Sequence, residues 1–323
     1  MIRFLASSIK SCTVFLFGAT GEIINQKSGQ LNMGTPGIMG LGAVGALIGE
    51  RIYIASISAT ASLNPFMVLF MPILFAIIFG GIGGLLFSFF TVTLHCNQNV
   101  TGLTLTTFGV GLAGFLTNSS IIPATRMTDV NTMIQNAFNW YSKLGWFGEI
   151  FLSQSWFTYL GIIVAVVTAI IIARTKVGLR LRAVGENAAA ADSAGISVNK
   201  YRYLSTIIGS GIVGLGGAFI ELDQHMGTFN ASADNVDAYG WIALCIVIFS
   251  LWKPLLAIAA SLFFASLSIL PSYIKGVGST MSYVIDMAPY IATIIILVVL
   301  SIFNGKKNQP PANLGQSYFR EDR

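Results

Sequence analysis

The sequence has very little charge. Only 10% of its 323 residues are Asp, Glu, Lys or Arg, against about 25% in a typical soluble domain. Between Arg51 and Arg126 there is no charged residue at all. Hydrophobic residues make up 54% of the chain, and the mean hydropathy is +0.74. A water-soluble fold could not cover its surface with so few charges, so the composition excludes a soluble enzyme, a disordered chain and a nucleic-acid-binding module.

Cysteine and histidine are also scarce. The three cysteines (Cys12, Cys96 and Cys245) are far apart and form no CxxC pair, and neither histidine (His95 or His225) has a Cys or carboxylate at metal-ligand spacing. The sequence therefore predicts no metal site, no disulfide and no catalytic residue. It also lacks a GxxxxGK[ST] loop, the usual cradle for nucleotide phosphates. Any ATP-driven step must then be carried out by a partner, with ATP and magnesium bound there.

What the chain does have is long apolar runs. A membrane helix needs about 20 apolar residues. Candidate spans cover 4–21, 37–50, 66–92, 100–117, 156–173, 203–221, 239–251, 254–270 and 287–303. Two of them, 37–50 and 239–251, are short enough to be re-entrant or broken helices. The sequence thus predicts an all-α polytopic membrane protein with 8–10 transmembrane helices, a single transmembrane domain over 1–305, and a flexible polar tail over 306–323.

Basic residues give the orientation. They are densest between Arg174 and Arg202, which predicts a cytoplasmic loop at about 174–202. Counting from this loop places 118–155, 223–238 and 271–286 outside, and Trp140, Tyr141, Trp146 and Trp156 suit the membrane interface. Arg3 and Lys10 favour a cytoplasmic N-terminus, which requires that 37–50 or a neighbouring segment does not cross fully. The first 20 residues resemble a signal peptide, but Lys10 interrupts the apolar run, so we expect a first membrane helix.

Glycine is frequent, with 34 residues. Two GxGxxG matches, Gly109–Gly114 and Gly209–Gly214, fall inside apolar spans, whereas a dinucleotide site needs a soluble strand–turn–helix unit. We therefore interpret the glycines mainly as sites of close helix packing. A hinge or a pathway lined by backbone is the alternative.

Polar residues within the apolar part of the chain are uncharged. Amides and hydroxyls both donate and accept hydrogen bonds, so they could line a pathway for a neutral, polyhydroxylated or heterocyclic solute. Hydrogen bonds between helices or helix caps are the alternative. The candidate pathway residues are Asn32, Asn97, Gln98, Asn99, Thr101 and Thr104. The acidic residues are expected in loops or near helix ends, with Glu22, Glu221, Asp223 and Asp286 closest to the membrane, which weighs against an ion-coupled secondary carrier.

The segment Arg174–Arg202 contains an alanine run, which favours a short helix, and Gly195 supplies a stop. A small-faced helix on a cytoplasmic loop can dock into a groove of another protein, although an ordinary linker fits the composition equally well.

This segment resembles the coupling loop of ABC importer permeases of the branched-chain amino acid, ribose and nucleoside class. The pattern T-x-x-G-L-x-x-R-A-V-G-E-N-x-x-A-A-x-x-x-G-I is present from Thr175 to Ile196. The segments 21–34, 97–102 and 214–218 are similar to further motifs of that class, in the same order. The form of the first two motifs is nearest the nucleoside branch, which also resembles permeases for riboflavin and simple sugars.

The resemblance implies an assembly in the bacterial cytoplasmic (inner) membrane. Two permease chains, different or identical, form the pathway; two ABC ATPase subunits dock on the cytoplasmic loops; and an extracytoplasmic binding lipoprotein delivers the solute. Membrane lipid surrounds the assembly and nucleic acid has no part in it. The residues expected to couple to the ATPase are Arg182, Ala183, Gly185, Glu186, Asn187, Ala191 and Gly195. An ion-coupled carrier and a structural membrane protein are the remaining hypotheses.

Overall fold

The computed structural model describes residues 1–57, 63–118, 145–224, 236–274, 284–285, 287–303 and 309–319. Trp140, Tyr141, His225, Asp286 and the Lys306–Lys307 pair lie outside these ranges. Within the described residues every regular element is helical, and seven helices are long and apolar enough to cross a membrane. Two shorter apolar helices accompany them. The predicted all-α polytopic architecture is therefore confirmed.

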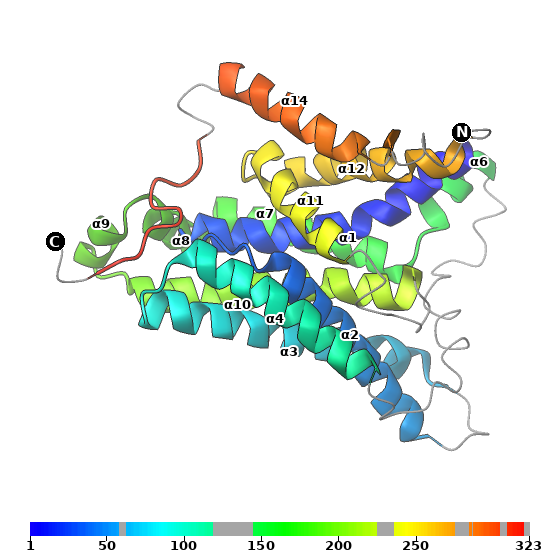
Figure 1. Cartoon of the computed structure of the whole chain (residues 1–323), viewed down its shortest axis with the longest axis horizontal. Coiled ribbons are helices and arrows are strands. Elements are labelled where there is room, and N and C mark those ends of the chain that lie inside the picture. The colour runs from blue at the N-terminus through cyan, green and yellow to red at the C-terminus, as the bar shows by residue number, and fades with distance from the viewer. Residues whose placement is uncertain are drawn as a thin grey trace.

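The helices form an elongated bundle around α1 (Ile2–Lys27), α2 (Thr35–Ala55) and α10 (Val198–Phe219) (Figure 1). Around them lie α3 (Pro65–Ser88), α4 (Gln98–Asn118), α7 (Trp156–Arg174), α11 (Val236–Phe249), α12 (Pro254–Tyr273) and α14 (Ala288–Phe303). In the most apolar window of α2, 78% of the residues are buried, but only 22% are in α12. The central helices thus contact protein, while the outer ones present apolar faces suited to lipid.

Glycine lets the central helices approach closely. A Cβ on Gly21 would overlap the backbone of α10 at Gly209, and a Cβ on Gly42 would overlap Gly214. Gly209 and Gly214 belong to one of the two GxGxxG matches, and both matches lie inside helices, α4 and α10. The packing interpretation of these glycines is confirmed, because the space for a side chain is already filled by a neighbouring helix.

The segment 37–50 was predicted to be short enough for a re-entrant or broken helix, and this is wrong. It belongs to α2, a helix of 21 residues that begins at Thr35 with Pro36 in its first turn and continues through Glu50 to Ala55. The prediction that 239–251 forms only a short helix is confirmed, since α11 has 14 residues. α11 ends at a tight reversal in which Leu251 and Trp252 have positive φ angles of 51° and 54°, an uncommon conformation for such residues.

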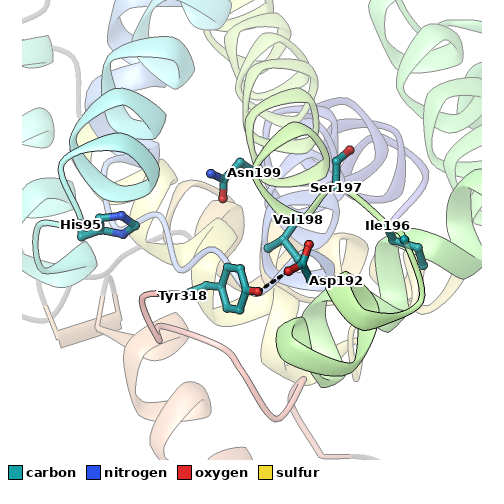
Figure 2. Close-up of a pocket in the computed structure, with 8 residues that line it drawn as sticks. His95, Asp192, Ile196, Ser197, Val198, Asn199 and Tyr318 are labelled. Atoms are coloured by element: carbon teal, nitrogen blue, oxygen red, sulfur yellow. Dashed lines mark hydrogen bonds between the residues drawn. The ribbon is translucent and has the colours of Figure 1, made fainter. Parts of the chain in front are cut away.

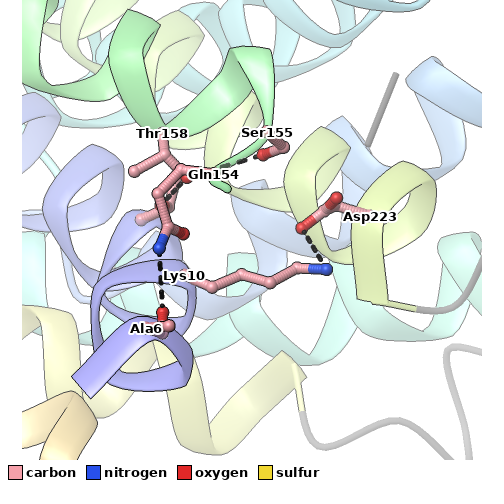
Figure 3. A network of polar contacts seen from close by, with 7 residues as sticks. Ala6, Lys10, Gln154, Ser155, Thr158 and Asp223 are labelled. Carbon is pink, nitrogen blue, oxygen red and sulfur yellow. Dashed lines mark hydrogen bonds and ion pairs between the residues drawn. The ribbon is translucent and has the colours of Figure 1, made fainter. Parts of the chain in front are cut away.

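The prediction that the N-terminus lies on the same side of the membrane as the loop at 174–202 is also wrong. The C-terminal end of α1 lies against that loop, whereas the N-terminus lies at the opposite end of the bundle (Figure 1). There Gln154 donates to the carbonyl oxygen of Ala6 (3.1 Å), and Lys10 forms an ion pair with the buried Asp223 at 3.1 Å (Figure 3). The charge of Lys10 is thus matched inside the protein, so it does not act as a free topological signal.

The C-terminal tail was predicted to be flexible. Residues 309–319 instead lie along the end of the bundle that carries the loop, next to α8 and α9 (Figure 1). Backbone hydrogen bonds connect these residues to Gly185 at the end of α8 and to Gly29 after α1. For residues 309–319 the prediction was wrong because it rested on composition alone, which does not show that surrounding elements offer hydrogen-bond acceptors. The remaining tail residues, 306–308 and 320–323, lie outside the described residues.

Candidate functional site

The loop that matches the coupling pattern folds into two short helices, α8 (Lys176–Glu186) and α9 (Ala188–Ser193). Thr175 caps α8 by accepting a hydrogen bond from the amide of Gly178 (3.1 Å). Asn187 separates the helices: its backbone is extended, and its side-chain oxygen accepts from the amide of Ala190 at 2.9 Å. Gly195 ends the second helix with a φ of 80°, a conformation that glycine adopts without strain.

Four of the seven predicted coupling residues are exposed: Arg182, Glu186, Asn187 and Gly195. Ala183 is half-buried. Gly185 is buried, and a Cβ there would overlap the carbonyl oxygen of Lys27 at the end of α1. Ala191 is buried in a small cluster with Val184 and other apolar residues of the loop. In this structure the exposed four can contact another protein directly, while Gly185 and Ala191 hold the loop against the bundle.

A groove of about 640 Å³ runs between α8 and the start of α10. On the loop side Val177 and Leu179 are 57% and 61% exposed, beside the exposed Arg180 and Arg182. This loop lies at one end of the bundle and exposes large apolar side chains next to cations. Such a combination is typical of a protein-docking surface. The arrangement favours docking over a plain linker.

The predicted pathway residues fall into two groups. Asn32 and Gln98 are buried and engaged: the Asn32 side-chain oxygen accepts from the amide of Gly34 (2.9 Å), and the Gln98 side-chain oxygen accepts from the amide of Leu31 (2.7 Å). In this structure Gln98 ties the turn at 28–34 to α4, whereas the Asn32 bond lies within the turn itself. Asn97 is exposed, and its side-chain oxygen caps α4. These positions match the alternative of caps and interhelical bonds.

Thr101 and Thr104 line a cavity of about 490 Å³ between α3 and α4. Their hydroxyls donate to carbonyls one turn back in α4, at 2.8 and 2.9 Å. The remaining lining is mostly apolar and includes three phenylalanines, Phe87, Phe90 and Phe108. Asn99 is exposed at the start of α4 and does not line this cavity.

A buried polar cluster centred on Glu22 was not apparent from the sequence. Its carboxylate accepts hydrogen bonds from Asn25 (2.7 Å), Gln26 (3.1 Å), the Asn32 amide (3.2 Å) and Thr35 (3.3 Å). Gln26 in turn accepts from the indole of Trp252 at 2.6 Å. Glu22 therefore joins α1, the turn at 28–34, the start of α2 and the α11–α12 reversal. Sequence position showed Glu22 near a helix end but not the donors around it.

In the described parts of the chain, no three His, Cys, Asp or Glu side chains come close enough to hold a metal ion. Glu22 and Glu50 lie near the C-terminal ends of α1 and α2, where acidic residues were expected, and both are almost fully buried. The described residues offer a docking loop, a braced helix core and an α3–α4 cavity.

Known proteins resemble the chain over most of its length. The profile of the family described as "Branched-chain amino acid transport system / permease component" matches residues 4–303. The nucleoside ABC transporter permease protein NupC of Lactococcus lactis is 31% identical over 98% of this chain and 96% of its own. The guanosine ABC transporter permease protein NupQ of Bacillus subtilis is 29% identical over 94% and 92%.

A more distant relative carries a different solute in its name. The putative glucose ABC transporter permease protein of Haloferax volcanii is 28% identical over 77% of this chain and 71% of its own. No solved structure matches the chain.

Proposed function

This chain belongs to the family of branched-chain amino acid transport system permease components, and on that premise we propose that it forms the translocation pathway of an ATP-driven nucleoside importer. It is a permease subunit, a multi-pass protein of the bacterial cytoplasmic membrane. The observation that carries the solute assignment is the nearly full-length match to two relatives named for nucleoside and guanosine transport.

The loop supports a role in receiving force from an ATPase. The exposed face of α8 combines apolar and cationic side chains, and Gly185 seats the loop against the end of α1. A push on α8 would therefore reach α1 without passing through flexible side chains. Because the chain lacks a phosphate-binding loop of its own, ATP and magnesium would be bound by separate ABC ATPase subunits.

The pathway would be completed by a second permease chain, different or identical. Apolar side chains are exposed beside the α3–α4 cavity, for example Phe90 just after α3 (43%) and Phe108 on α4 (50%). Aromatic rings with nearby threonine hydroxyls suit a solute that has both a flat heterocycle and hydroxyl groups. An extracytoplasmic binding lipoprotein would deliver this solute from the side opposite the coupling loop.

Uptake by whole cells tests this proposal. The chain and its partner subunits are expressed in a host that lacks nucleoside uptake, and entry of tritiated uridine and guanosine is measured. Unlabelled nucleosides are expected to compete, while glucose and riboflavin are not. Competition by glucose or riboflavin, with none by nucleosides, would reassign the solute. The control for ATP dependence is the same assembly with an ATPase subunit that is inactivated in its phosphate-binding loop.

A further inference from the structure

The C-terminal segment 311–319, here called the strap, lies across the end of α8. The amide of Asn313 donates to the carbonyl oxygen of Gly185 at 3.0 Å, and the amide of Ala312 donates to the carboxylate of Glu186 at 3.3 Å. Carbonyls in the last turn of a helix have no partner within the helix. The strap supplies one, so it completes the C-terminal end of the first coupling helix.

The strap also binds two turns outside the coupling loop. The amide of Gly315 donates to the carbonyl oxygen of Gly29 (3.0 Å), in the turn between α1 and α2. The side-chain amide of Gln98 donates to the carbonyl oxygen of Gln316 (3.4 Å), while its oxygen accepts from Leu31. Gln98 therefore bridges the strap and the turn that carries Asn32, a donor to Glu22.

The last residues of the strap reach the second coupling helix. The Tyr318 hydroxyl donates to the Asp192 carboxylate at 2.9 Å, and the two residues face each other across one side of a cavity of about 390 Å³ (Figure 2). The Tyr318 side chain also packs against the apolar cluster under α9. The Phe319 ring lies 4.5 Å from the ring of His95, which follows α3.

We propose that the strap is a positioning element that ties α8 and α9 to the α1–α2 and α3–α4 turns, so that movement of the coupling loop reaches the helices that form the pathway. This inference rests on the proposed transport function. Its contacts form a continuous chain from Asp192 and Gly185, through the strap and Gln98, to the turn held by Glu22.

A blocking role is the opposite possibility, and the exposure of the loop argues against it. With the strap in place, Val177 and Leu179 remain more than half exposed, and Arg182 and Asn187 are exposed as well. The strap therefore leaves these four residues of the proposed docking face accessible.

Two truncations test the proposal in the assembled transporter. One removes residues 310–323 and with them all the strap contacts. The matched control removes only residues 320–323, which follow the strap. Uptake of labelled nucleoside, ATP hydrolysis and co-purification of the ATPase are measured for both.

We expect the longer truncation to bind the ATPase and hydrolyse ATP but to lose uptake by about tenfold or more, because several hydrogen bonds that seat the loop are lost together. The shorter truncation should behave like the full chain. Uptake that equals the control would overturn the proposal. Uptake that rises above the full chain would also overturn it, since the strap would then be inhibitory.

A point variant separates this inference from the transport assignment and serves where the truncated chain does not insert. Tyr318→Phe removes only the hydroxyl that binds Asp192. Hydrogen exchange of the backbone amides at 312–315 should become about tenfold faster, because a hydrogen bond to a charged acceptor is lost. Tyr290→Phe, on α14, is the control. Exchange at 312–315 that does not change on Tyr318→Phe would contradict the proposal whatever solute the protein carries.

Discussion

At the scale of single residues, Glu22 is the best-connected buried side chain described above. Four donors from three parts of the chain converge on one carboxylate. A buried donor that loses its acceptor costs about 1–3 kcal/mol, so the cluster is sensitive to the loss of this one side chain.

Glu22→Ala should therefore destabilise the protein by several kcal/mol, on the order of 2–4 after the surroundings relax. The measurement is the melting temperature of the detergent-purified protein, which should fall by several degrees. Glu149→Ala is the control, because Glu149 is exposed and makes no described side-chain hydrogen bond. Equal melting temperatures for the two variants would show that the Glu22 cluster does not hold the helices together.

Gly185 tests the seating of the coupling loop. Gly185→Ala places a methyl group into the carbonyl oxygen of Lys27, an overpacking that costs about 1–3 kcal/mol and displaces α8. Uptake should fall strongly while membrane insertion is retained. Gly111→Ala is the matched control, since a Cβ there meets nothing within 4 Å. Full uptake by Gly185→Ala would mean that close contact between α8 and α1 is not needed for transport.

At the scale of elements, the break between α8 and α9 depends on Asn187. Without its cap, the alanine run that follows Asn187 favours continuation of α8 into α9 as one helix. Asn187→Ala should cost about 1 kcal/mol of stability at the cap and reduce uptake. Asn187→Asp should retain both the stability and the uptake, because aspartate is an equally good cap. Uptake assays on the pair give the answer, and equal loss in both variants would point to a contact of Asn187 rather than to its cap.

The elements show how far sequence reasoning reaches. The alanine-rich helix α9 and its end at Gly195 could be predicted because both signals are local. The separate helix α8 and the caps at Thr175 and Asn187 were not predicted, although these signals also act within a few residues. The length of α2 could not be predicted, because its many glycines look unfavourable for a helix, and Glu50 looks unfavourable for a membrane span. Packing against α10 and α3 holds it in place, and that contact is not visible in the local sequence. The strap was missed for the same reason, since its partners lie in distant segments.

At the scale of the whole molecule, the two ends of the bundle differ. One carries the coupling loop, the strap and the C-terminal end of α1, and the other carries the N-terminus and the Lys10–Asp223 pair. The positive-inside rule predicts that the coupling loop is cytoplasmic, and on that basis we expect the N-terminus outside.

Cysteine labelling tests this orientation. In a chain freed of its three native cysteines, Arg3→Cys should react with a membrane-impermeant thiol reagent added to intact cells, because Arg3 is exposed at the outer end. Arg180→Cys, on the exposed face of α8, should react only after lysis. Labelling of both positions from the same side would contradict the arrangement of α1 described here.

The most direct test of the central claim uses purified components. The chain is reconstituted into vesicles with its ATPase, permease and binding-protein partners, and nucleoside uptake is followed with ATP supplied on the coupling-loop side. The account predicts uptake that requires hydrolysable ATP and the binding protein, with none from a proton or sodium gradient alone. Uptake by this chain alone, driven by such a gradient without ATP, would show that it is a secondary carrier.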